Sequence, residues 1–248
     1  MSWIIPLLTG LAILVAGILI TVNKTKSTRM LGISFIFNAI KVLIAGIYTI
    51  AVHNLKGEEV AAIVYPYNTA VIITGCLSTL FLCFFIHKNY GKKLIYLPLF
   101  IIPAAGWLAD RIIIMTLSKF IGAGNSIGLW IELTSQIDNS IISAAVAVIV
   151  FIVFFKNRKT EKVIPKAWLI KAILLGWSLL HTIIYTCILL HMISNESSVS
   201  GMDYRILTLI SNPIAFAFPL YVLISVFAAS KTKEEDEPYD LPEPPYQI

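Results

Sequence analysis

Seven long apolar stretches separated by short polar loops constrain this 248-residue chain more than any other feature. Each has about 18 residues or more, enough for a helix rising 1.5 Å per residue to cross a hydrocarbon core roughly 30 Å thick. Hydrophobic residues make up 58% of the chain and the mean hydropathy is +0.84. The stretches run near residues 3–22, 30–52, 68–86, 94–117, 138–155, 167–193 and 206–229. The pattern predicts an all-α, polytopic bundle of seven transmembrane helices in the lipid bilayer of a cell membrane.

The basic residues predict the orientation of this bundle. Thirteen of the 19 Lys and Arg residues lie in the loops after the first, third and fifth stretches or at the start of the tail. The opposite loops hold Lys56, Lys119 and Arg205. Because short cytoplasmic loops are enriched in Lys and Arg, we expect the N-terminus outside and the C-terminus in the cytoplasm. The first stretch has no basic segment before it, so we expect a retained helix rather than a signal peptide.

Composition and motifs argue against several function classes. The net charge of +5 reflects the basic loops of one side and does not indicate nucleic-acid binding. Three cysteines lie inside apolar stretches without CxxC spacing, so neither a disulfide framework nor a thiolate metal site is predicted. The seventh stretch has no lysine for a retinal Schiff base. Because no phosphate loop, HExxH motif, nucleophile elbow or cluster of carboxylates and histidines is present, we expect no enzymatic activity, no cofactor and no metal.

Lys41 is the most informative polar residue within the apolar stretches, where each such group is costly unless it is paired or hydrated. It lies midway along the second stretch, with Asn38 one turn before it. It is too central to reach either interface with its side chain. Two interpretations remain open, a structural charge paired with a carboxylate or a part of a ligand or ion path. In either case we expect it to meet an acceptor, with Asp110, Glu132 or Asp138 as candidates.

Further polar residues extend this candidate site along other stretches. Asp110 and Arg111 are sequence neighbours, point about 100° apart on a helix and therefore need different partners. His181 is central in the sixth stretch, with Tyr185 one turn on, and Asn212 precedes a proline that is expected to kink the seventh. Each residue also has a structural interpretation as part of an outer polar network or a hydrogen-bonded core. The candidate intramembrane polar site comprises Asn38, Lys41, Asp110, Arg111, Glu132, Asp138, His181, Tyr185 and Asn212.

Two segments lie outside the predicted spans. Residues 118–137 are glycine-rich and contain Trp130, which predicts an interfacial segment rather than a span. From Glu234 to Ile248 the chain is acidic and rich in proline, which favours an extended, solvated conformation. The chain thus divides into a transmembrane domain (1–230) and a cytoplasmic tail (231–248). The tail is interpreted either as a solubilising end or as a docking peptide for a cytoplasmic protein.

Three passages resemble the seven-helix membrane region that precedes some bacterial and archaeal sensor histidine kinases. They are the short basic turn after the first stretch, YGKKLIYLPLFIIP (Tyr90–Pro103) and NPIAFAFPL (Asn212–Leu220). Topology and overall length are similar as well. The second stretch departs from the family in lacking a tryptophan, and no kinase domain follows within the 248 residues. The resemblance implies a receptor-like sensory input module that signals to a separate cytoplasmic or membrane partner.

Residues 1–93 also resemble the three-helix C-type small subunit of multisubunit sodium/proton antiporters. GISFIFNAIK (Gly32–Lys41) is similar to the family pattern GLSLxxxxVN, and PYNTAVIIT (Pro66–Thr74) is similar to PLPQALVLT. Lys41 stands where the family has asparagine, and four further stretches have no counterpart. This resemblance implies a cation- or proton-translocating, or small-solute, transporter subunit of a larger membrane complex.

Overall fold

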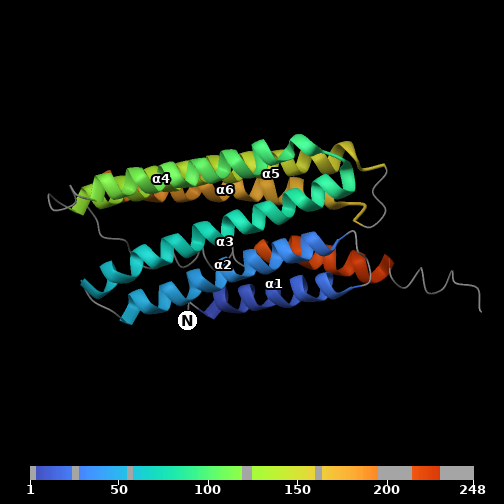
Figure 1. Cartoon of the computed structure of the whole chain (residues 1–248). Coiled ribbons are helices and arrows are strands. Elements are labelled where there is room, and N and C mark those ends of the chain that lie inside the picture. Colours follow the sequence, from blue (N-terminus) through green and yellow to red (C-terminus); the bar gives the residue numbers. More distant parts are fainter. Residues whose placement is uncertain are drawn as a thin grey trace, which may run out of the picture.

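The computed structural model of the chain describes residues 4–23, 28–54, 58–118, 125–159, 164–194 and 214–229 (Figure 1). All regular structure in these ranges is helical, which confirms the predicted all-α class. The helices are α1 (Ile4–Val22), α2 (Arg29–Asn54), α3 (Glu58–Tyr90), α4 (Ile102–Ser118), α5 (Asn125–Lys156) and α6 (Ala167–Ser194). A further helix, Ile214–Ala229, is called the C-terminal helix below.

The apolar character of these helices is that of a membrane protein. Five segments are long and apolar enough to cross a bilayer, namely Ile4–Val22, Arg29–Tyr48, Pro66–Tyr90, Lys93–Ile113 and Ala167–Ile188. Ile141–Lys156 and Ile214–Ala229 are shorter apolar helices. Large apolar side chains are exposed along the outer helix faces, for example Val22 at 73% and Ile183 at 61%. Such faces are compatible with direct contact with lipid.

One predicted boundary differs from the structure. Residues 125–137 were expected to lie in the interface apart from the fifth span, but they form the first part of α5. A helix satisfies the backbone hydrogen bonds of this polar segment internally, and Gly128 costs only about 1 kcal/mol inside it. The predicted stretch 138–155 is therefore the apolar second half of a 32-residue helix.

Successive helices run antiparallel, so alternate connections meet at the same end of the bundle. α1, α3 and α5 end where α2, α4 and α6 begin, at the right in Figure 1. The α3–α4 connection there consists of Gly91, Lys92, a 3-10 turn (η1, Lys93–Ile95) and a π-helical turn (η2, Leu97–Ile101). The described basic residues of this end, called the basic end below, are Arg29, Lys88, Lys92, Lys93, Lys156, Arg158, Lys159 and Lys166.

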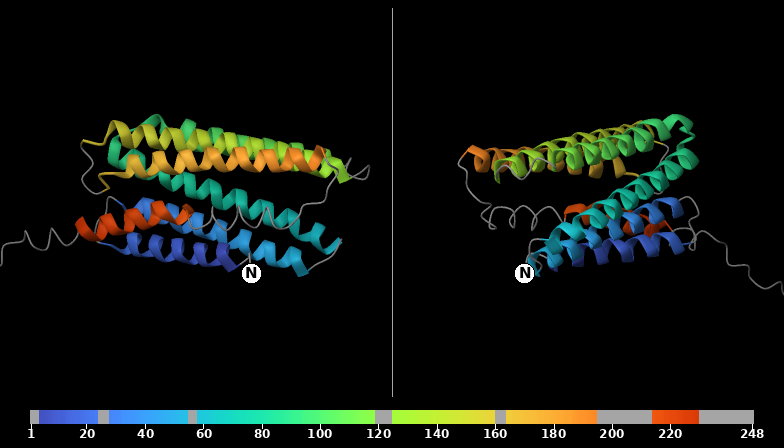
Figure 2. Two further views of the ribbon diagram at one scale, coloured as in Figure 1. Left: turned by 180° about the vertical axis from the view of Figure 1, so that it is seen from behind. Right: turned by 60° about the vertical axis from the view of Figure 1, so that its left-hand side comes forward.

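The helices form two sets of three. α1 packs along α2 and α2 along α3, while α4 packs on α5 and α5 on α6. Contact between α3 and α4 is short, and the two sets lie apart over much of their length in Figures 1 and 2. The C-terminal helix lies beside α1 and α2 in both views. The C-terminal helix also contacts the connection between α5 and α6. There the peptide N–H of Lys166 donates a hydrogen bond to the Tyr221 hydroxyl at 3.0 Å.

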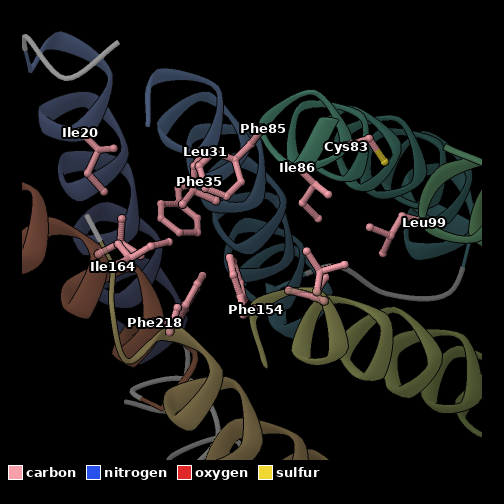
Figure 3. Close-up of a cluster of buried hydrophobic side chains, with 14 of the residues drawn as sticks. Ile20, Leu31, Phe35, Cys83, Phe85, Ile86, Leu99, Phe154, Ile164 and Phe218 are labelled. Atoms are coloured by element: carbon pink, nitrogen blue, oxygen red, sulfur yellow. The ribbon is translucent and has the colours of Figure 1, made fainter. Parts of the chain in front are cut away.

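An aromatic cluster joins the two sets near the basic end (Figure 3). The Phe218 ring of the C-terminal helix lies 5.8 Å from the Phe35 ring of α2 and 6.0 Å from the Phe154 ring of α5. Phe154 in turn lies 6.4 Å from Phe85 of α3. All four side chains are buried. Aromatic pairs of this kind contribute about 0.5–1.5 kcal/mol each beyond burial, so this cluster helps to hold the two sets together.

Candidate functional site

Lys41 lies where α2 meets α3 and α4. Its ammonium Nζ is 5.7 Å from the centre of the Trp107 ring of α4. A Cβ added to Gly75 of α3 would lie 4.0 Å from this Nζ and 3.6 Å from the Trp107 ring, both ordinary contact distances, so Gly75 borders the two groups. The Cys76 thiol is an electrostatic neighbour of the same ammonium. A desolvated cation over a Trp ring is stabilised by about 2 kcal/mol, which offsets part of the cost of burying Lys41.

Polar contacts recur along the α2–α3 interface on either side of Lys41. Ser34 and Ser78 exchange hydrogen bonds, each hydroxyl donating to the other residue's carbonyl oxygen at 2.8 Å and 3.0 Å. Toward the other end, the rings of Tyr48 and Tyr67 stack at 3.8 Å with an interplanar angle of 12°. Ser34, Lys41 and Tyr48 follow one another at seven-residue spacing, which places them on one side of α2. We call this row of contacts the polar seam.

Arg111 connects the second helix set to α3. A terminal guanidinium nitrogen of Arg111 donates a hydrogen bond to the side-chain oxygen of Asn68. Its Nε is buried and has no hydrogen-bond partner among the residues that the structure describes. The neighbouring Asp110 is buried and attracts the Arg111 guanidinium electrostatically. Asp110 follows Trp107 by three residues, so it lies on the same side of α4 as the ring that contacts Lys41.

The other predicted site residues lie elsewhere or outside the described part of the chain. Asn38 is half-buried on α2. On α6, the His181 and Tyr185 rings lie parallel, 6.2 Å apart, with Tyr185 buried. Glu132 and Asp138 belong to α5, but their side chains are outside the described set, as is the whole of Asn212. The structure thus brings Lys41 together with the helix that carries Asp110 and Arg111, and places the His181–Tyr185 pair on a separate helix.

Sequence reasoning missed the partners in this site. Trp107, Gly75 and Asn68 were not singled out, although Asn68 and Gly75 are seven residues apart and share one side of α3. The seven-residue spacing of Ser34, Lys41 and Tyr48 was a usable signal for a polar side of α2. No comparable signal pointed to Trp107, because a tryptophan within an apolar stretch usually indicates packing.

The site combines cationic, aromatic and amide side chains from three helices. Among the described residues, no group of three or more His, Cys, Asp or Glu side chains could hold a metal ion. Its distinctive groups are the Lys41 ammonium over an aromatic ring and the Arg111 guanidinium, whose Nε has no hydrogen-bond partner within the described ranges. No protein-family model, curated protein or solved structure matches this chain.

Proposed function

We propose that this protein is a sensory, receptor-like module of a cell membrane that passes a conformational signal to a separate partner. The observation that carries this proposal is the contact between Lys41 of α2 and Trp107 of α4. It joins the two helix sets in the middle of the predicted spans, where direct packing between them is sparse. A stimulus that changes the charge or the contacts of Lys41 would change how α4 sits against α2 and α3.

The energy of this contact is suitable for a switch. About 2 kcal/mol corresponds to a roughly 30-fold change in an equilibrium between two arrangements of the helix sets. α4 begins directly after the short connection at the basic end, so a movement of α4 would reach the side on which we place a cytoplasmic partner. The acidic tail, Glu234–Ile248, lies outside the described residues and is our candidate docking segment for that partner.

The proposal includes seven crossings with the N-terminus outside. Five segments meet the length and hydropathy expected of a span. α5 has 32 residues, so its apolar half and the preceding turns together exceed the roughly 20 residues that a crossing needs. The predicted seventh stretch begins at residue 206, before the described helix Ile214–Ala229. An odd number of crossings agrees with the predicted placement of the basic loops on one side.

A second candidate function is a cation- or proton-translocating, or small-solute, subunit of a larger membrane complex. The polar seam and the neighbouring Asn68–Arg111 hydrogen bond favour it, because they place polar contacts at successive positions along the helices. Polar groups at successive depths of an apolar bundle are the usual lining of an ion or proton path.

One reconstitution experiment separates the two functions. Spin labels at Leu11 of α1 and Leu108 of α4, both exposed, report the distance between the helix sets in nanodiscs, after Cys76, Cys83 and Cys187 are replaced by alanine. The matched control for Lys41→Met is Lys88→Met, which removes an exposed charge near the end of α3, outside the polar seam.

A sensory module predicts a shifted distance distribution in Lys41→Met, no shift in Lys88→Met, and no ion flux in liposomes. A transporter predicts a proton or sodium flux that Lys41→Met abolishes and Lys88→Met retains. An unchanged distance distribution in Lys41→Met, with normal stability and no flux, would contradict both functions.

A further inference from the structure

A groove of about 570 Å³ opens at the basic end between the α3–α4 connection and the last turns of α5. One wall is formed by Gly91, Lys92, Lys93 and the turns that follow. The connection can turn sharply because Gly91 adopts a φ of 64°, a left-handed conformation that ends α3, and its N–H bonds the carbonyl of His87 at 2.9 Å. The opposite wall is Ile152, Val153, Lys156 and Asn157 of α5.

The polar rim of this groove is cationic. Lys92, Lys93 and Lys156 come from two separate elements and are all exposed. Asn157, the other polar side chain of the lining, already donates to the carbonyl of Val153 at 2.7 Å. Among the side chains that the structure describes, the one carboxylate is Asp110, which follows Pro98 of the groove by 12 residues, roughly 18 Å along a helix. The described neighbours therefore leave the three ammonium groups without an anionic counterpart.

The remainder of the groove is apolar and continues onto a lipid-facing surface. Ile95 and Val153 are buried at its floor, whereas Leu94 is 88% exposed beside the lysines. Leu97, Ile101 and Ile102 extend this exposed apolar strip along the start of the fourth span. An exposed leucine next to three lysines is unfavourable in water but suits the membrane interface, where ammonium groups meet headgroups and apolar side chains meet acyl chains.

We infer that this groove binds an anionic phospholipid, with the headgroup phosphate between Lys92, Lys93 and Lys156 and an acyl chain along Leu94 and Leu97. The inference goes beyond the proposed function, since it holds for a sensory module and for a transporter subunit alike. A groove volume of this size is within the range of known small-ligand sites. A phospholipid satisfies both halves of the lining, whereas a free phosphate satisfies only the lysines.

The test measures binding of phosphatidylglycerol by the full-length protein in mild detergent, with phosphatidylcholine as the zwitterionic reference. Native mass spectrometry gives the affinity, and thermal unfolding gives an independent readout. The variant K92Q/K93Q/K156Q removes the three rim charges. Its matched control is K88Q/K159Q/K166Q, which removes three exposed charges of the same basic end outside the groove lining. All six side chains are exposed, so both variants are expected to fold.

We expect phosphatidylglycerol to raise the unfolding temperature of the wild type and of the control more than phosphatidylcholine does. The groove variant should bind it roughly 100-fold more weakly, because each lysine near an anionic headgroup contributes about fivefold. Equal loss in both triple variants would overturn the inference in favour of a diffuse surface potential. Stabilisation by inorganic phosphate or glycerol 3-phosphate alone would overturn it in favour of a free anion.

Discussion

At the scale of single residues, Lys41 shows how a buried charge is accommodated in an apolar bundle. Its ammonium lies over the Trp107 ring, and Gly75 of α3 borders both groups. The ring face carries the negative end of the aromatic quadrupole, so it attracts a cation without adding a second charge to the membrane. Of the three carboxylates predicted as partners of Lys41, only Asp110 has a described side chain. The prediction that Lys41 meets a carboxylate stays a prediction.

A double-mutant cycle tests the energy of this contact. We expect Lys41→Met and Trp107→Leu, measured singly and together by unfolding in mixed detergent micelles, to show a coupling energy of about 1–2 kcal/mol. The matched cycle pairs Lys41→Met with Trp177→Leu on α6 and should give a coupling within about 0.5 kcal/mol of zero. Equal coupling in the two cycles would show that the Lys41–Trp107 contact has no special energetic role.

At the scale of elements, α1 and α2 approach closely at two glycines. A Cβ on Gly32 would lie 2.8 Å from the backbone N of Thr21 and 2.9 Å from the carbonyl oxygen of Gly17. The Thr21 hydroxyl bonds that same Gly17 oxygen at 2.7 Å. Small residues at a helix interface let backbones approach and increase dispersion contact, which is the main attraction between helices in lipid. Gly17 and Gly32 thus mark the close approach of α1 and α2.

Adding one methyl group tests this interface. We expect Gly32→Ala to lower stability by about 1–3 kcal/mol, because backbone atoms of α1 must move to admit the new Cβ. Gly176→Ala on α6 is the matched control, since a Cβ there meets nothing within 4 Å. That control should be neutral or stabilising by up to about 1 kcal/mol through helix propensity. Thermal unfolding in detergent measures both, and a neutral Gly32→Ala would contradict the close approach.

At the scale of the whole molecule, the two helix sets share one basic end. The connections after α1, α3 and α5 meet there, and the groove, the aromatic cluster and the Lys166–Tyr221 hydrogen bond all lie close to it. Basic residues at one end are expected to face the cytoplasm and its anionic leaflet. The basic end is therefore where orientation, lipid contact and partner contact are best tested.

Cysteine labelling tests the orientation. In a cysteine-free background, we expect Thr160→Cys to be protected from a membrane-impermeant maleimide in intact cells and Ser198→Cys to be labelled. Both positions lie outside the described residues, so the expectation rests on the distribution of Lys and Arg in the sequence. Labelling of residue 160 from outside would reverse the proposed topology.

Deleting Glu234–Ile248 tests the role of the acidic tail, which also lies outside the described residues. The deletion removes six carboxylates from the side that carries most of the basic residues. If the tail shields the basic end, the truncated protein should bind anionic lipid or a partner more tightly at low salt. This gain should shrink as ionic strength shortens the screening length to about 8 Å. If the tail is a docking peptide, partner capture should be lost instead; unchanged binding in both assays would exclude the two roles.

The amino-acid sequence by itself determined the class of this protein and the place of its charges. Apolar runs of this length must satisfy their backbone groups internally in lipid, so helices follow from local composition alone. Lys41, Asp110 and Arg111 were identifiable for the same reason, since a charge within such a run is visible without knowledge of its neighbours. The extension of α5 back to Asn125 could not be identified in this way, because a polar segment that contains glycine has little local preference for a helix.

Only the tertiary structure decided which groups these charges meet. Trp107 lies 66 residues after Lys41 in the chain, and Arg111 lies 43 residues from its partner Asn68. Such contacts depend on helix rotation, on the close approach at Gly17 and Gly32 and on the turn at Gly91. The groove likewise combines lysines from two elements that are far apart in sequence. The physical reason is that contact between helices in lipid depends on shape complementarity at the interface, which is a property of the assembled bundle and not of any single stretch.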